Sequence, residues 1–426
     1  MADGNRRTEA WTRRETLLAG AATMAADAAA ITASGSAATM AADGATTLAP
    51  SMVGRRTLSV LPTVDARPDG EVHLLHRERD RYRRLEVLGE GGMGVVEKAE
   101  DVDIGRPIAI KRLNEEANHA VGIARFVGEV RIVGGLDHPN VAPIHDVGVD
   151  EDGRYFFVMK YVEGQTLAAV IEALAAGDPS AHAHWTFERR IEAMIGVLRA
   201  LEYAHSHGVL HRDVKPDNIM IGRFGEVWLV DWGIAAKIGE RELGVPTAED
   251  GSSTALCGTP AYMSPEQVEG RALDARSDVY SAAVTLHELL TLGHYLAHRA
   301  DNLATLLDAV VHESPAVAGV GLHHHPHQSA PPIEVQRIVE ASLSKDPAAR
   351  IPSASAMIGA LQDYLAGRNH ARCVYSFTKR SLRAGGHMVD KAPRMVVLSF
   401  FLLAGLAAFG LVMALVLLAR GLGAFG

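Results

Sequence analysis

The chain has 426 residues, enough for two or three domains. Its 48% apolar and 22% charged residues are those of an ordinary globular protein, and the net charge of −9 argues against a nucleic-acid partner, whose binding proteins are usually basic. The two cysteines, Cys257 and Cys373, are too few for a disulfide framework, so we expect the folded part in a reducing compartment.

The first 77 residues are predicted to be a disordered tail. Ala, Gly, Thr and Ser dominate them, and Trp11 is their one aromatic residue. Without a sustained hydrophobic period, such a composition gives little apolar surface to bury.

Ordered sequence is expected to begin near Tyr82, just before a glycine-rich motif. Gly89-Glu90-Gly91-Gly92-Met93-Gly94 has the spacing G-x-G-x-x-G, and the β-branched pair Val95-Val96 follows it. In a dinucleotide-binding fold the third glycine would open a helix, whereas these flanks predict strand, loop, strand. A loop of this kind is a flap whose backbone N–H groups can approach phosphates, because glycine has no Cβ.

Lys111 ends the apolar run Ile108–Ile110, which predicts a strand. It is either a strand-end lysine facing water or an ammonium group that binds phosphates and is held by a glutamate on a helix. We prefer Glu129 as that glutamate, because Glu115 and Glu116 come too early for the middle of the expected helix.

The next segments predict two strands and then helices. Val141–Gly148 and Arg154–Tyr161 are the strands, and Tyr161–Gly164 is a connector between two lobes. From Leu167 onward the pattern is helical, and Phe187–Gly208 carries an apolar stripe at positions 187, 191, 194, 195, 198 and 201.

A polar loop, His211–Asn218, follows this helix. Its pattern is H-R-D-x-K-P-x-N, and Pro216 disfavours helix at the residue before it. Asp213, Lys215 and Asn218 supply a carboxylate, an ammonium group and a carboxamide within six residues. These groups can accept a hydroxyl proton, steady a phosphoryl group and ligate magnesium.

A second magnesium ligand is predicted thirteen residues later. The apolar run Val227–Val230 places Asp231 at the end of a strand, and Trp232-Gly233 follows. A carboxylate there can share a magnesium ion with Asn218, because Mg²⁺ prefers oxygen ligands.

Three further motifs complete an ordered set: Cys257–Glu266 (CGTPAYMSPE), Ser277–Tyr280 (SDVY) and Asp346–Arg350 (DPAAR). With them, residues from about Tyr82 to Ala366 resemble the eukaryotic-like serine/threonine protein kinases of bacteria. The resemblance implies an α+β, bilobal protein-kinase fold with a small β-rich lobe and a large helical lobe. It also implies ATP and Mg²⁺ as cofactors, and serine or threonine hydroxyls of proteins as acceptors.

The resemblance further implies a role for each site residue. Asp213 would be the base and Lys215 would contact the γ-phosphate, while Asn218 and Asp231 would hold magnesium. Thr259 would belong to the substrate platform. The ATP-binding positions would be Leu88, Gly89, Glu90, Gly91, Gly92, Met93, Gly94, Val96, Ala109, Lys111, Glu129, Met159, Lys160 and Val162. Three residues would have structural roles, namely Asp278, which would brace the catalytic loop, and the pair Glu266 and Arg350.

The sequence departs from the family pattern at three positions. Trp232 replaces a phenylalanine and brings an indole N–H that needs a partner. Ser264 replaces an alanine, and Lys160 replaces a common glutamate at a position that acts through its backbone. The alternative function is a nucleotide-binding pseudokinase scaffold, which the intact Lys111 and Asp213 disfavour.

A hydroxyl-rich patch lies between Asp231 and Glu266. We expect autophosphorylation at Ser252, Ser253 or Thr254, which would order this loop through the cation of Arg212. A merely polar loop is the alternative.

The C-terminal end predicts a membrane anchor. Met395–Ala419 has 25 residues with Ser399 as its one polar side chain, and as a helix it would be about 37 Å long, enough to span a bilayer. Gly367–Arg394, a basic linker, holds seven Lys or Arg against one acid, so the positive-inside rule places the kinase in the cytoplasm at the inner membrane and residues 420–426 outside. Small residues at Ala404/Ala408 and Gly410/Ala414 leave a homodimer open.

Overall fold

The structure is a computed structural model, and it describes residues 58–59, 61, 63–66, 72–75, 79–91, 94–237, 258–299, 302–313 and 325–368. The chain forms two compact units, Met1–Leu361 and Gln362–Gly426. The elements that position the site belong to the first unit.

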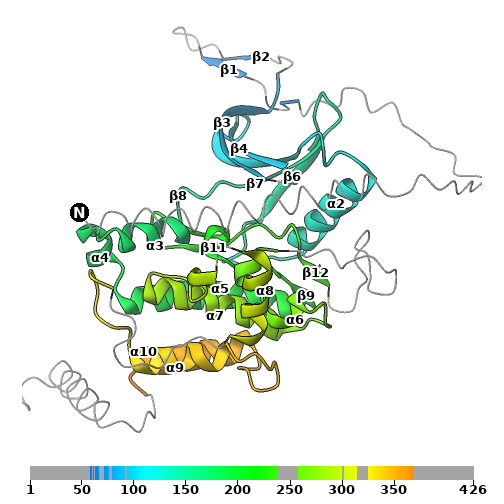
Figure 1. The fold of residues 1–426 in the computed structure, drawn as a ribbon. Coiled ribbons are helices and arrows are strands. Elements are labelled where there is room, and N and C mark those ends of the chain that lie inside the picture. The colour runs from blue at the N-terminus through cyan, green and yellow to red at the C-terminus, as the bar shows by residue number, and fades with distance from the viewer. Residues whose placement is uncertain are drawn as a thin grey trace, which may run out of the picture. The chain divides into compact units, whose positions relative to one another are not determined.

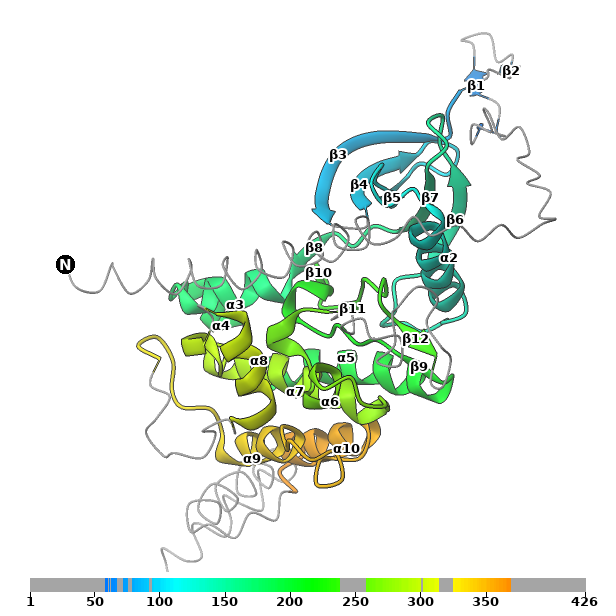
Figure 2. The ribbon, with the colours of Figure 1, turned by 45° about the vertical axis from the view of Figure 1, so that its right-hand side comes forward.

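A five-stranded antiparallel sheet dominates the small lobe in the part of the chain that the structure describes (Figure 1). Its order is β3-β4-β5-β7-β6, and the strands are β3 (Tyr82–Gly91), β4 (Gly94–Asp101), β5 (Arg106–Leu113), β6 (Ile144–Val149) and β7 (Tyr155–Lys160). Helix α2 (Ala120–Gly134) lies beside this sheet (Figure 2). Gly91 pairs with Gly94 across β3 and β4, so the glycine motif joins two strands, as its flanks predict.

A short hairpin precedes the sheet. Strands β1 (Thr63–Ala66) and β2 (Val72–Leu75) pair antiparallel. The composition of the first 77 residues predicts no regular structure here, but these two segments contain the β-branched residues that favour strands.

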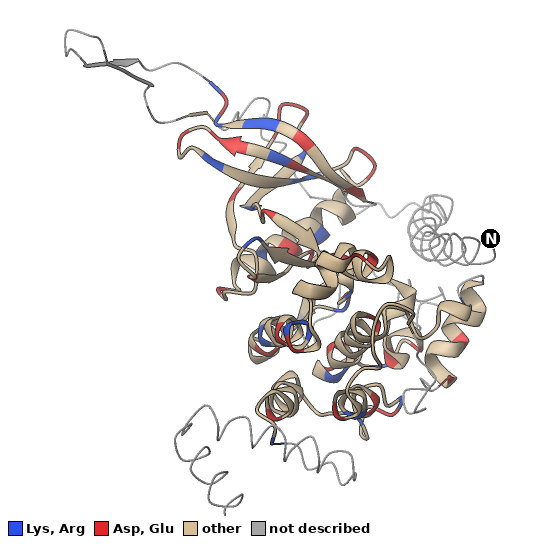
Figure 3. Cartoon of the chain, turned by 90° about the vertical axis from the view of Figure 1, so that its left-hand side faces the viewer, with Lys and Arg blue, Asp and Glu red and all other residues tan. Residues whose placement is uncertain are grey.

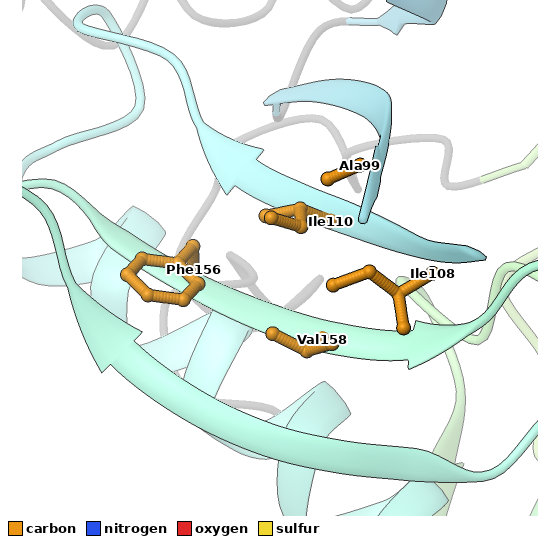
Figure 4. Close-up of a cluster of buried hydrophobic side chains, with 5 residues drawn as sticks. All are labelled: Ala99, Ile108, Ile110, Phe156 and Val158. Atoms are coloured by element: carbon orange, nitrogen blue, oxygen red, sulfur yellow. The ribbon is translucent and has the colours of Figure 1, made fainter. Parts of the chain in front are cut away.

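The two faces of the small-lobe sheet are buried separately. One face gathers Ala99, Ile108, Ile110, Phe156 and Val158 (Figure 4), because alternate residues of a strand point to the same side. On the other face, Leu113 and Phe157 pack with Ala117 and with Phe126 of α2. This apolar contact fixes α2 against the strand that carries Lys111.

Gly148 illustrates how closely the first face is packed. It pairs with Phe156 across β6 and β7, and a Cβ at this position would lie 2.5 Å from the Phe156 ring. The ring therefore lies over the backbone of β6, where only glycine leaves room for it.

Basic and acidic residues both occur along the strands of this sheet (Figure 3). Lys98 forms a salt bridge with Glu86, and Arg83 forms one with Glu100. Arg81 forms a bidentate salt bridge with Asp101. Exposed pairs such as Arg83–Glu100 contribute little, typically below about 1 kcal/mol each, so apolar burial holds this lobe together.

The large lobe is built mainly of helices. These are α3 (Leu167–Ala175), α4 (Pro179–His184), α5 (Phe187–Ser206), α6 (Pro265–Val268), α7 (Ala275–Thr291), α8 (Leu303–His312), α9 (Ile333–Ser342) and α10 (Ala354–Leu365). Helix α5, which packs against α7, buries the predicted apolar stripe: Ile191, Met194 and Leu198 are fully buried.

Short strands and turns carry the loops between these helices. The strands are β8 (Gly164–Thr166), β9 (Val209–Leu210), β10 (Ile219–Gly222), β11 (Val227–Leu229) and β12 (Ala236–Lys237). Single 3₁₀ turns are η1 (Pro216–Asn218), η3 (Pro260–Tyr262) and η4 (Ala297–Arg299). The pairs β9–β12 and β10–β11 bracket the segment His211–Asn218.

A buried ion pair ties together distant parts of the large lobe. Arg350 donates to both carboxylate oxygens of Glu266 at 2.7 and 3.0 Å, and their side chains are 0% and 3% exposed. Burial opposes ionisation of Glu266, but the hydrogen bonds from Arg350 outweigh it and lower the pKa of the carboxyl group. Removing one partner of such a pair typically costs about 3–5 kcal/mol, because it leaves the other charge buried and unpaired.

Lys345 is a partly buried ammonium group in the same region. Its Nζ donates to the hydroxyl of Tyr280 at 2.8 Å and to the carbonyl of Val310 at 2.6 Å. Burial, together with the nearby charge of Arg350, lowers the pKa of Lys345 from 10.5 to about 8.

The stability of the protein is therefore expected to rise with pH through the titration of Lys345. Between pH 8 and 10.5 the unfolded chain holds the proton that the folded chain has released, so raising the pH favours the folded state. From pH 7 to about 9.5, the free energy of unfolding of the wild type should gain about 1–2 kcal/mol relative to Lys345→Met. Urea unfolding of both proteins at the two pH values measures this gain. A constant difference would contradict the prediction.

Candidate active site

Lys111 of β5 and Glu129 of α2 form an ion pair inside the small lobe. The Nζ atom lies 2.7 and 3.0 Å from the two oxygens of Glu129, and the side chains are 13% and 2% exposed. Burial raises the pKa of Glu129 in spite of the lysine charge. Glu115 and Glu116 precede α2, so the structure brings Glu129 to Lys111.

Asp231, directly after β11 and Val230, reaches the same lysine from the large lobe. Its Oδ1 lies 2.9 Å from Lys111 Nζ, and its side chain is 50% exposed. The lysine charge lowers the pKa of Asp231 to about 2, so this carboxylate is ionised throughout the neutral range. The pKa of Lys111 is raised, because the two carboxylates outweigh the effect of its burial. One ammonium group thus binds carboxylates from two lobes.

The loop after β9 gathers the other predicted chemical groups around Asp213. Lys215 Nζ lies 2.7 Å from Asp213 Oδ2 and 2.6 Å from Thr259 Oγ1. Thr259 donates its backbone N–H to Asp213 Oδ1 at 2.9 Å. Asn218 Nδ2 donates to the carbonyl of Asp213 at 2.9 Å and to its Oδ2 at 3.1 Å. The carboxylate of Asp213 is therefore fixed by donors on both oxygens.

Asp278 of α7 binds the backbone of this loop. It is fully buried, and it accepts the backbone N–H of His211 at 2.9 Å and that of Arg212 at 2.8 Å. Burial alone would raise the pKa of Asp278, but the bonds from His205 and the loop backbone outweigh it and lower the pKa. Asp278 thus holds a residue in the left-handed region, since Arg212 has φ +68°.

The indole of Trp232 finds the partner that its N–H requires. Its Nε1 donates to the carbonyl of Leu229 at 3.3 Å, and its ring meets the imidazole of His211 edge-on at 4.5 Å. Burial lowers the pKa of His211, which disfavours the charged form of that ring. The replacement of phenylalanine by tryptophan is accommodated without an orphaned donor.

Two oxygen-bearing side chains are suited to hold a divalent cation. Because Asn218 Nδ2 donates to Asp213, the carboxamide oxygen of Asn218 is directed away from that carboxylate. Asp231 is ionised and half exposed. A carboxylate and a carboxamide are the kind of ligands that Mg²⁺ takes alongside water and phosphate.

The predicted nucleotide positions lie mainly on the sheet. Ala109 of β5 pairs with Met159 of β7, and the backbone continues into Lys160 and Val162. A Cβ at Gly94 would lie 2.1 Å from the carbonyl of Arg112, so β4 and β5 require glycine there. The other described members lie on β3 and β4: Leu88, Gly89, Glu90, Gly91 and Val96.

Some predicted residues lie outside the described part of the chain. They are Gly92 and Met93 of the glycine motif, the patch Ser252–Thr254, and the predicted span Met395–Ala419. Among the helices that the structure does describe, none is both long enough and apolar enough to cross a membrane.

Sequence reasoning missed two residues that hold the loop. His205 Nε2 contacts Asp278 Oδ2 at 2.8 Å, and Gln267 Nε2 donates to the carbonyl of Arg212 at 2.9 Å. The S-x-x-Q pattern from Ser264 to Gln267 does predict a helix cap, which the structure contains. The second bond of Gln267, to another loop, has no signature in the sequence.

A β-rich lobe and a helical lobe, with a lysine paired to carboxylates from both and a loop of the pattern H-R-D-x-K-P-x-N, define a protein kinase. The family model described as protein kinase domain matches residues 82–360, and the chain belongs to that family. The predicted bilobal kinase fold is confirmed. Kinases of this family use ATP and a divalent metal ion.

The curated relatives are bacterial serine/threonine kinases. The chain is 35% identical to a probable serine/threonine-protein kinase of Streptomyces coelicolor over 65% of this chain and 39% of that protein. It is 38% identical to the probable serine/threonine-protein kinase PknB of Bifidobacterium longum over 50% of this chain and 30% of the relative. It is 31% identical to the serine/threonine-protein kinase PknD of Chlamydia pneumoniae over 68% of this chain and 31% of that protein.

These relatives confirm the prediction of a serine/threonine kinase domain of the bacterial type. The chain spans well under half the length of each of the three.

Proposed function

We propose that this protein transfers the γ-phosphoryl group of ATP to serine and threonine hydroxyls of proteins in bacterial signalling. The observation that carries the proposal is the position of Lys111 Nζ, which lies within 3 Å of both Glu129 and Asp231. A kinase needs this lysine–glutamate ion pair in place together with a magnesium ion on the carboxylate that corresponds to Asp231.

Each residue around the transferred phosphoryl group would have a separate role. Asp213, fixed by Thr259 and Asn218, would accept the proton of the acceptor hydroxyl. Lys215, held between Asp213 and Thr259, would contact the γ-phosphate. Phosphoryl transfer requires alignment and charge neutralisation more than covalent chemistry, and a fixed base and fixed ammonium groups supply both.

The cofactor positions extend this proposal. Asn218 and Asp231 would hold magnesium, which when bound neutralises charge on the phosphates. The glycine motif of β3 and β4 would cover the phosphates, and Lys111 would contact them. Apolar residues of the small lobe and of the connector would enclose adenine beside the backbone of 160–162: Leu88, Val96, Ala109 and Val162.

Contacts among the site residues favour a serine/threonine acceptor, and they also favour an active enzyme over a pseudokinase scaffold. Thr259 lies against Lys215 at 2.6 Å, which supports a hydroxyl-bearing substrate platform of the serine/threonine type. A pseudokinase scaffold would not need all four of the catalytic and metal-binding side chains held in contact at one site, and here they are Lys111, Asp213, Asn218 and Asp231. We therefore favour an active enzyme.

The first test uses the purified full-length chain, radiolabelled ATP, magnesium and a protein substrate. Asp213→Asn should lower the rate of incorporation by about 10²–10⁴-fold, because a positioned general base contributes that much. Asp308→Asn, on the exposed face of α8, is the matched control and should leave the rate unchanged. Equal incorporation by the wild type and Asp213→Asn would overturn the assignment of the base.

We also propose that the patch Ser252–Thr254 is autophosphorylated. The phosphate would pair with Arg212, the residue before the base, whose Nε donates to the carbonyl of Ile234 in the segment after Asp231. New charge-assisted hydrogen bonds of this kind order a loop.

Mass spectrometry before and after incubation with ATP tests this modification. We expect phosphate on Ser252, Ser253 or Thr254, appearing as the kinase activity rises, and no phosphate at these sites in Asp213→Asn. An unmodified patch in a preparation whose activity has risen would rule it out.

The domain order is a further proposal. It comprises a tail over residues 1–77, the kinase domain over 82–366, a basic tether over 367–394, and one span at Met395–Ala419. The kinase domain would lie in the cytoplasm beside the inner membrane, and the basic tether would contact anionic lipid. Small residues on the span would allow a homodimer.

Fractionation of cells that express the full chain tests the membrane anchor. The kinase should stay in the membrane pellet after an alkaline carbonate wash, because a 25-residue apolar helix inserts stably. A chain that lacks residues 395–426 should move to the soluble fraction, whereas one that lacks residues 1–57 should not. Release of the full chain by carbonate would contradict a span.

A further inference from the structure

Gln267 joins the segment after Thr259 to the catalytic loop. Its Nε2 donates to the carbonyl of Arg212 at 2.9 Å. The N–H of the same residue, Arg212, is held by Asp278 at 2.8 Å. Both backbone polar groups of Arg212 are therefore tied by buried or partly buried side chains from other elements.

Arg212 needs such restraint because of its backbone. Its φ of +68° lies in the left-handed region, which residues other than glycine seldom adopt. A conformation of this kind persists only where the surroundings hold it. The next residue is Asp213, so the orientation of Arg212 sets where that carboxylate points.

The orientation of the Gln267 carboxamide is fixed by its other end. Ser264 is fully buried, and it donates its backbone N–H to Gln267 Oε1 at 2.9 Å. An N–H can only donate, so the oxygen must face Ser264 and the NH₂ group must face the Arg212 carbonyl.

We propose that Gln267 is a positioning residue for the phosphoryl-transfer reaction, in that its bond to the Arg212 carbonyl aims Asp213 at the acceptor hydroxyl. This inference rests on the proposed function. The segment 259–267 reaches the base twice, once through the Thr259 N–H on Asp213 Oδ1 and once through Gln267 on the preceding residue.

A simpler role for Gln267 is the helix cap alone. Ser264 and Gln267 form the capping box of α6. At this position of a capping box, glutamate serves as well as glutamine, because only an oxygen acceptor is needed. A carboxylate in place of the amide, however, would set an oxygen without a proton against the Arg212 carbonyl. Gln267→Glu therefore separates the two roles.

The experiment measures kcat, the KM for ATP and the Tm of the full-length wild type, Gln267→Glu and Gln267→Met. Both variants should lower kcat roughly tenfold to hundredfold, because each loses the bond that orients the base. The KM for ATP should stay within about twofold, because the nucleotide positions are untouched. The Tm of both variants should stay well above the assay temperature, which shows that the loss of kcat is not a loss of the fold, and the neutral Gln267→Met excludes an effect of added charge.

Gln328 offers a matched control. Its Oε1 accepts from Arg190 at 2.8 Å and its Nε2 donates to the carbonyl of Leu290 at 2.7 Å, the same double contact made away from the catalytic loop. Gln328→Glu should leave kcat unchanged.

The possible outcomes are distinct. An active wild type with an equally active Gln267→Glu would overturn this inference and leave the proposed function intact, as would an equal loss of kcat in Gln328→Glu. A wild type that transfers no phosphate would overturn both. Loss of kcat in both Gln267 variants, at constant KM, supports the positioning role.

Discussion

The ammonium group of Lys111 joins the two lobes at the candidate active site. It binds Glu129 on a helix of the small lobe and Asp231 on a loop of the large lobe, at 2.7 and 2.9 Å. Glu129 is almost fully buried, so without the lysine its charge would be left unpaired in an apolar setting. The pair therefore favours one position of α2, and the apolar contacts of Phe126 with Phe157 hold the helix in that position.

Two of the three non-glycine residues with positive φ in the described part of the chain lie beside the groups that carry the proposed chemistry, and the third, Leu292, ends α7. Arg212 and Asp231, both non-glycine residues, have φ values of +68° and +59°. Each of them is restrained by a charged or polar partner from another element: Asp278 and Gln267 hold the backbone of Arg212, and Lys111 holds the carboxylate of Asp231. Residues with these backbone angles are costly in isolation, so their persistence indicates that the surrounding bonds over-determine the loop.

The sequence predicts those parts of the site whose chemistry demands particular residue types at fixed spacing. Asp213, Lys215 and Asn218 are close in the chain, so their convergence follows from one irregular loop. Glu129 could be preferred over Glu115 and Glu116 because a helix carries its central residues toward the sheet on which it packs. His205 and Gln267 could not be predicted, because each acts through a partner 73 or 55 residues away that only the tertiary fold brings near. The composition of the N-terminal stretch likewise hid the hairpin β1–β2, because short β-branched segments are lost in its Ala-rich average.

The contacts of Asp213 also suggest where its alignment is controlled. The carboxylate of Asp213 accepts a hydrogen bond from the backbone N–H of Thr259, and the carbonyl of the preceding residue, Arg212, accepts one from Gln267. The ammonium group of Lys215 contacts both Asp213 and Thr259. Thr259 and Gln267 belong to one segment, which follows the patch proposed for phosphorylation along the chain. A shift of that segment would alter the hydrogen bonds of the base and of the strained residue before it at the same time. Because both contacts come from residues 259–267, the orientation of Asp213 depends on the position of that segment as well as on the loop 211–218.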